Sequence, residues 1–204
     1  MLPVSTAYEL HGRTNQKQRT RQALVDVARE HVARGRTPTV EDAAAGAAIS
    51  RATAYRYFPN QAALLAAAHP ETAALSLLPA NAPEDPEQRV ALVVEAFTKI
   101  IVNTERQQRT MLRLSLVDDD DRRPSLPLRQ GRAIGWLIEA LEPARELLGE
   151  DGVWRTAVAI RSAIGVEALI WLTDMAGLSR RRAVELMRSN ASAICRAALA
   201  EVRA

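Results

Sequence analysis

The chain has 204 residues, of which 48% are hydrophobic, 25% are charged and 4% are aromatic, a composition that favours an aliphatic, all-α protein of one large or two small domains. Its single cysteine, Cys195, excludes an internal disulfide framework and a cysteine-based zinc site. No uncharged apolar run reaches about 18 residues and no apolar signal segment opens the chain, so we expect a cytoplasmic protein without a membrane-spanning helix.

The formal net charge is +3, and it is unevenly distributed. Residues 1–60 hold nine Lys or Arg and five Asp or Glu, whereas the remainder holds eighteen and nineteen. The positive excess therefore lies in the N-terminal part, where it favours a polyanionic partner, although an excess of this size is weak evidence alone.

Residues 1–15 lack apolar periodicity, and we expect them to form a disordered arm. Apolar residues then repeat at helical spacing over 16–34, and Gly35 suits the left-handed end of that first helix. Phosphate contact and a solvated helix start remain equally open for the basic residues at the junction, which are Arg13, Lys17, Arg19 and Arg21.

Two short helices joined by a tight turn are predicted over Thr39–Phe58. Thr39 and Asp42 form a start that resembles a capping box, and Ser50 caps the next helix over Arg51–Tyr57, before Pro59 ends it. We expect Ala54 and Phe58 to face the core and the polar residues to face outward. Asn60 is a good N-cap for a fourth helix over about 60–69.

The outward side of the Arg51–Tyr57 helix carries groups that contact DNA. Arginine reaches guanine edges or phosphates, a threonine methyl touches thymine, and tyrosine hydroxyls donate to phosphates. We therefore expect insertion into a major groove, while a capped surface helix with two half-buried tyrosines remains the alternative. The expected DNA-binding residues are Thr39, Ser50, Arg51, Ala52, Thr53, Tyr55, Arg56, Tyr57 and Gln61.

The segment TVEDAAAGAAISRATAYRYFPNQAALL resembles the signature of the tetracycline-repressor (TetR) family of bacterial transcription regulators, and the resemblance covers residues 20–66. It implies that Thr39, Tyr55 and Tyr57 meet phosphates. It also implies that Arg51, Ala52 and Thr53 face bases, in an N-terminal helix-turn-helix domain with its connecting helix over 16–68.

Two positions depart from that family pattern. Ala48 stands where the family usually has its turn glycine and Gly46 lies two residues earlier, so we expect either an earlier end of the helix or a strained or shifted turn at Ala48. Gln61 replaces the family's phosphate-contacting lysine, and the loss of one charge predicts a salt dependence shallower by about one unit of slope at each half-site.

The remainder, 69–204, is predicted to be a helical effector-binding and dimerisation domain. We expect a connector over 70–85 and helices over 86–102, 104–116, 130–148, 152–176 and 180–203. Four adjacent carboxylates over 118–121 do not match an EF-hand and have no histidine nearby, so a solvated loop with Pro124 and Pro127 accounts for them better than a metal site.

The last two predicted helices are too apolar for one buried face, and the resemblance implies that they form a dimer interface. A core helix of a monomer is the alternative. The expected interface residues are Val158, Ile164, Leu169, Leu172, Val184, Met187, Ala191, Ile194 and Ala198. Cys195 is expected to be a small buried residue.

No cofactor and no metal is expected, and catalysis has little support because the three histidines are far apart and no phosphate loop or nucleophile motif appears. We expect a nucleoid-associated homodimer that is most simply a repressor, bound to a pseudo-palindromic double-stranded DNA operator and released by a small-molecule effector. The alternatives are an effector-independent DNA-binding co-regulator and, less favoured, a helical ligand-binding or enzymatic bundle. The candidate effector-lining residues are His69, Phe97, Met111, Trp136 and Trp171, although ordinary core packing is the favoured alternative for the last four and a plain helix-end position for His69.

Overall fold

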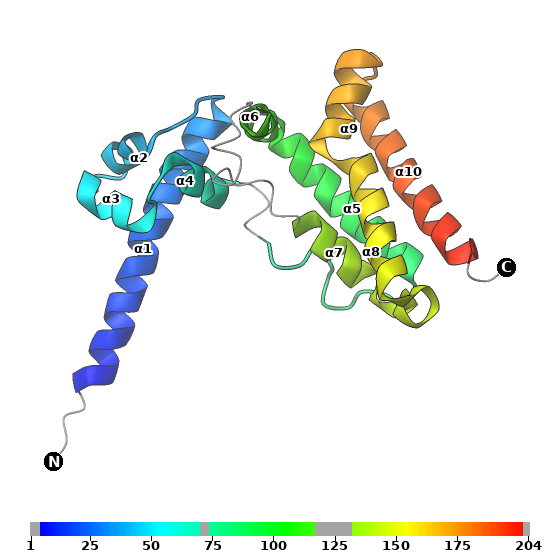
Figure 1. The fold of residues 1–204 in the computed structure, drawn as a ribbon, viewed down its shortest axis with the longest axis horizontal. Coiled ribbons are helices and arrows are strands. Elements are labelled where there is room, and N and C mark those ends of the chain that lie inside the picture. Colours follow the sequence, from blue (N-terminus) through cyan, green and yellow to red (C-terminus); the bar gives the residue numbers. More distant parts are fainter. Residues whose placement is uncertain (1–4, 70–73, 117–131, 202–204) are drawn as a thin grey trace. The chain divides into compact units, whose positions relative to one another are not determined.

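The computed structural model describes residues 5–69, 74–116 and 132–201, and within these ranges every regular element is a helix (Figure 1). The all-α expectation is therefore confirmed for this part of the chain. The chain divides into two compact units, one made of residues 1–70 and 109–128 and the other of residues 71–108 and 129–204.

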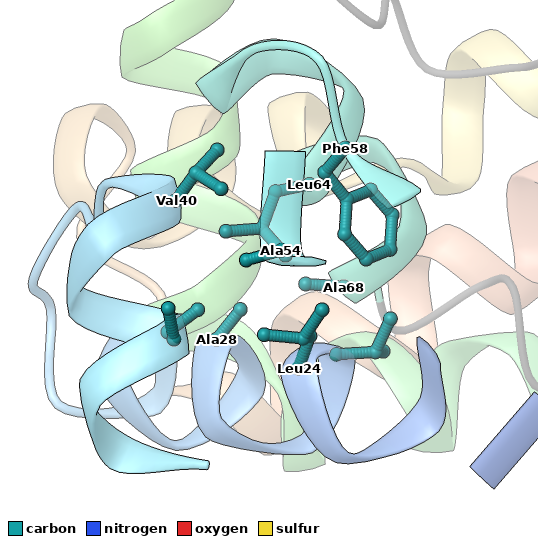
Figure 2. Close-up of a cluster of buried hydrophobic side chains, with 10 residues drawn as sticks. Leu24, Ala28, Val40, Ala54, Phe58, Leu64 and Ala68 are labelled. Carbon is teal, nitrogen blue, oxygen red and sulfur yellow. The ribbon is translucent and has the colours of Figure 1, made fainter. Parts of the chain in front are cut away.

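The first unit packs short helices against one long helix. A buried cluster of aliphatic side chains and one phenylalanine holds them together, with Leu24 and Ala28 from the long helix facing Val40, Ala54 and Leu64 (Figure 2). Small alanines at the contacts let the helix backbones approach closely. The elements are α1 (Ser5–Ala33), α2 (Val40–Gly46), α3 (Arg51–Tyr57) and α4 (Gln61–Ala68).

The long helix α1 begins at Ser5, so the expectation of a disordered arm over 1–15 is corrected for residues 5–15. Residues 5–15 contain no proline, and the hydrogen bonds of a helix form within the backbone and need no apolar stripe. The predicted start at residue 16 marked the point where apolar periodicity, and hence packing, begins. Residues 1–4 lie outside the described residues.

The second unit is a bundle in which α10 packs along α5 and α8, and α7 packs between α5 and α8 (Figure 1). The predicted helices over 86–102, 104–116 and 180–203 are found almost as expected. The elements are α5 (Pro86–Asn103), α7 (Arg132–Ala140), the 3-10 turn η3 (Glu142–Ala144), α8 (Arg145–Ile164), α9 (Val166–Ile170), the π-helical turn η4 (Trp171–Met175) and α10 (Arg180–Glu201). Helix α6 (Glu105–Ser115) begins in this unit and belongs to the first unit from Arg109 on. The predicted loop at 118–127 lies outside the described residues.

Two predicted long helices are broken. The helix expected over 130–148 ends at Ala140, and a 3-10 turn that contains Pro143 follows it. The next helix is kinked at Gly149, whose φ of 69° only glycine adopts easily. The helix expected over 152–176 is interrupted at Gly165, which has an extended ψ of 173°, and ends in a π-helical turn.

Arg89 closes the end of α7. Its Nε donates to the Ala140 carbonyl at 3.1 Å and its Nη2 donates to the Glu139 carbonyl at 3.0 Å, while Nη1 donates to the Pro83 carbonyl at 3.2 Å. The last carbonyls of a helix have no partner within the helix, so one guanidinium satisfies two of them and anchors α5 to α7.

One stretch, Glu142–Met175, is long and apolar enough to cross a membrane by length and composition, and 44% of its most apolar window is buried. The stretch is broken at Gly149 and Gly165, and it packs against α7 and α10. The absence of a membrane partner stays a prediction.

Candidate nucleic-acid interface

The start of α2 is fixed by a reciprocal cap, as predicted. The Asp42 amide donates to the Thr39 hydroxyl oxygen at 3.1 Å, and the Thr39 amide donates to the Asp42 carboxylate at 2.8 Å. The Thr39 hydroxyl also donates to that carboxylate at 2.8 Å. These hydrogen bonds, the one from the Thr39 amide first, lower the pKa of Asp42 below its ordinary value.

The turn between α2 and α3 is a Schellman motif built on alanine. The Ala48 amide donates to the Ala45 carbonyl and the Ile49 amide donates to the Ala44 carbonyl, which satisfies the end of α2. Ala48 has a φ of 54°, the left-handed region that favours glycine. The expected strained turn is therefore confirmed at Ala48.

Gly46 serves a different purpose, because α1 leaves no room for a side chain there. A Cβ at Gly46 would lie 2.6 Å from the Val27 Cγ1 atom, closer than real Cβ contacts. Gly46 thus permits the close approach of α2 to α1, while Ala48, two residues later, adopts the strained conformation of the turn.

Helix α3 has a buried side and an exposed side. Ser50 caps it through a 3.2 Å hydrogen bond from the Thr53 amide. Ala54 is fully buried and Phe58 is 2% exposed, as predicted. Of the expected DNA-binding residues, the exposed ones are Thr39, Ser50, Arg51, Ala52, Tyr55 and Arg56, and the partly buried ones are Thr53, Tyr57 and Gln61.

A carboxylate that the sequence did not single out ties the exposed side of α3 to α2. Glu41 Oε1 accepts a hydrogen bond from the Tyr55 hydroxyl at 2.7 Å and lies 2.8 Å from Arg51 Nη2. The Arg51 guanidinium carbon also lies 5.7 Å from the centroid of the Tyr55 ring. The hydroxyl donor first, and the charge of Arg51 after it, lower the pKa of Glu41, while the same hydrogen bond raises the pKa of Tyr55.

Gln61 has a structural contact in place of the expected phosphate contact. Its Nε2 donates to the Pro38 carbonyl at 2.9 Å and to the Thr37 carbonyl at 3.4 Å. Both amide protons are therefore directed at the backbone, and only these protons suit a phosphate acceptor. The prediction that Gln61 binds DNA is corrected, whereas Asn60 caps α4 as predicted, accepting from the Ala63 amide at 2.8 Å.

Two other residues that were considered as DNA contacts also pack against the first unit's own side chains. The Tyr57 ring is half-buried and packs on the α1–α4 core cluster, which leaves its hydroxyl as the part suited to a phosphate. The Arg21 guanidinium stacks over the Phe58 ring at 5.2 Å, which ties the middle of α1 to the end of α3.

The five expected effector-lining residues do not converge. Phe97 and Trp136 pack edge to face with centroids 5.8 Å apart in the core of the second unit. Trp171 is 61% exposed, so its assignment to an enclosed pocket is corrected. Met111 packs in a cluster with Val32 and Leu65 of α1 and α4, and His69 is buried at the end of α4.

A described pocket of about 250 Å³ lies elsewhere, between the start of α5 and α10. It contains none of those five residues. Burial first, and the charges of Glu87 and Asp85 after it, raise the pKa of the Cys195 thiol to about 11, which agrees with the expected inert, buried cysteine. The residues that line this pocket are Asp85, Glu87, Gln88, Ala91, Ser192 and Cys195.

Most of the expected dimer-interface residues pack inside their own chain. The prediction is wrong for five of them, each at most 6% exposed, because the sequence pattern did not separate the inner side of each helix from the outer: Ile164, Leu169, Leu172, Met187 and Ala191. Val158, Val184, Ile194 and Ala198 are partly buried and remain candidates.

The structure exposes large apolar side chains that sequence reasoning missed at this surface. Trp154 on α8 is 54% exposed, Met175 at the end of η4 is 76% exposed and Leu186 on α10 is 39% exposed, in addition to Trp171. Trp154 and Val158 are four residues apart and could have been found as a helical side next to that of the buried Val153 and Ala157.

No protein-family model matches this chain, and no curated protein matches it. The residues of the site therefore carry the functional argument, together with the resemblance of the segment around α2 and α3.

Proposed function

We propose that this chain is a dimeric, sequence-selective DNA-binding transcription regulator of the TetR type, with α2, the Ala48 turn and α3 as its helix-turn-helix. The observation that carries the proposal is the division of α3 into a buried side and an exposed side. Ala54 and Phe58 anchor the helix, while Arg51, Ala52 and Arg56 are exposed. A helix with arginine and small residues near its N-terminus fits a major groove.

The proposed test is a fluorescence anisotropy titration of the full chain at moderate salt. Its probes are duplexes covering the DNA that flanks the protein's own gene, with scrambled duplexes of equal composition. We expect tighter binding to one flanking duplex and no more than weak binding to the scrambled ones. Equal binding to both would refute sequence selectivity and favour the helical ligand-binding or enzymatic bundle.

The dimer part of the proposal rests on the exposed apolar residues of α8, η4 and α10. Two tryptophans and a methionine left in water are unusual for a monomer of this size, and a second copy would cover them. A dimer also sets two reading heads at the spacing of two half-sites.

The dimer is tested by light scattering during gel filtration. We expect the wild-type chain to run as a dimer and Trp154→Glu and Trp171→Glu to run as monomers with weaker binding to DNA. Leu75→Glu is the matched control, because Leu75 is 95% exposed in a connecting segment of the same unit. A monomeric wild-type chain at micromolar concentration would refute the dimer.

The repressor mechanism and the small-molecule effector are supported by the resemblance alone. An effector must bind the DNA-competent and DNA-incompetent states unequally to release the operator. The effector-independent co-regulator is the second candidate, because two of the expected effector-lining residues, Phe97 and Trp136, are buried and pack against each other. A screen for compounds that abolish the anisotropy change decides between the two.

A further inference from the structure

A single carboxylate oxygen on α2 contacts two side chains on the exposed side of α3. Glu41, in the first turn of α2, accepts from the Tyr55 hydroxyl at 2.7 Å and lies 2.8 Å from Arg51 Nη2. Arg51 and Tyr55 are one helical turn apart on α3, and the guanidinium lies against the tyrosine ring. Two long side chains of the reading surface are thus fixed before any DNA is present.

The donors of these two side chains are affected differently. A guanidinium has five N–H groups, and the contact with Glu41 leaves donors at the other nitrogens. The Arg51 side chain is 73% exposed, so those donors face solvent. A tyrosine hydroxyl has one proton, and Tyr55 donates it to Glu41, so in this arrangement it has none to give to a phosphate acceptor.

Charge favours a base over a phosphate as the partner of Arg51. A phosphate beside Arg51 would also approach the ionised Glu41 carboxylate, which repels it. The N7 and O6 atoms of guanine are neutral acceptors and are not repelled in this way. Fixing a long side chain before binding also removes part of the entropy cost of forming the contact.

We propose that Glu41 is a specificity-determining positioning residue, which directs Arg51 to a base pair through the shared hydrogen bonds with Tyr55. Tyr55 then fixes the position of Glu41 and does not bind a phosphate, contrary to the role that the family resemblance implies. The inference rests on the proposed DNA-binding function, and it gives a role to Glu41, which is not among the expected DNA-binding residues.

The test is selection from a duplex library with a randomised centre, using the full-length wild-type chain and its variants, followed by anisotropy titrations on single-base variants of the selected site. Arg51→Ala identifies the base pair that Arg51 reads, and loss of a bidentate contact is expected to cost roughly tenfold to a hundredfold in discrimination there. We expect Glu41→Gln and Glu41→Asp to relax the preference at that same base pair by roughly three- to tenfold, and Tyr55→Phe to do so by less.

Glu30→Gln is the matched control. It removes the same charge from the first unit, at an exposed pair with Arg34 on α1 that does not touch α3. We expect it to change affinity for all duplexes alike and to leave base preference intact. Glu41→Asp keeps the charge and shortens the reach, so it separates positioning from simple charge removal, and circular dichroism melts show whether each variant is folded.

The inference is overturned if folded Glu41→Gln and Glu41→Asp keep the full preference at the Arg51 base pair, or if Tyr55→Phe weakens binding to all sequences equally. A wild-type chain that enriches no sequence defeats the proposed function and this inference together. A wild-type chain that selects a site while the Glu41 variants select it equally well defeats the inference alone.

Discussion

Replacing Ala48 by glycine should stabilise the first unit. Ala48 ends the Schellman motif with a φ of 54°, where the alanine Cβ crowds the following carbonyl. The side chain is exposed, so its removal costs no buried contact. Glycine adopts the same backbone conformation without the steric cost.

The magnitude follows from two opposing terms. The left-handed conformation costs an alanine about 1–2 kcal/mol. Glycine loses more chain entropy on folding, which offsets about 0.5–1 kcal/mol of the gain. The net stabilisation is therefore expected to be about 0.5–1 kcal/mol.

Native-state hydrogen exchange is the appropriate assay, because the chain has two units and a single melting curve would mix them. We expect the slowest amides of α2 and α3 to exchange roughly two- to fivefold more slowly in Ala48→Gly. Ala45→Gly, an exposed helix-interior change three residues earlier, should lose about 0.5–1 kcal/mol and exchange faster. Unchanged or faster exchange in Ala48→Gly would refute the assignment of strain to this turn.

Three further predictions concern the same unit. Gly46→Ala should destabilise it by about 1–3 kcal/mol through overpacking, and adding Val27→Ala should recover part of that loss in a denaturant titration. Gln61→Ala should lower stability by about 1 kcal/mol in the same titration but leave the affinity for DNA unchanged in folded protein, and a weaker affinity would restore the phosphate role. The lowered pKa of Asp42 means that its contribution is present above the unfolded pKa and is lost as pH falls through the folded one, so the wild type should lose stability in acid more steeply than Asp42→Asn in pH-dependent melts.

The short helices of the first unit were predictable because their signals are local. The caps at Thr39, Ser50 and Asn60 each act within three residues, and each is found in the structure. The left-handed turn at Ala48 was anticipated from the family pattern, which has a glycine at this position. Local chemistry of this kind does not depend on what packs elsewhere.

Part of the second unit was less predictable because apolar residues lie on nearly every side of the stretch Val153–Leu172. Leu169 and Trp171 are neighbours in one apolar run, yet one is fully buried and the other is 61% exposed. The interruption at Gly165 changes which residues face inward, and a helical period continued through it assigns the wrong side. Glu41 was missed for a related reason, since its partners lie on another helix and only the packed structure brings them together.

Under the proposed DNA-binding function, the link between Glu41 and Arg51 also constrains how a sequence of this kind can change its target. Exchanging Arg51 for a residue that reads another base would leave Glu41 with its negative charge facing the groove. Exchanging Glu41 first would loosen Arg51 before a new reader is in place. Recognition of a new operator is therefore expected to require substitutions at both positions. Each single substitution should bind either operator less well than the original or the doubly substituted chain binds its own. Related chains with different operators should therefore differ at both of these positions.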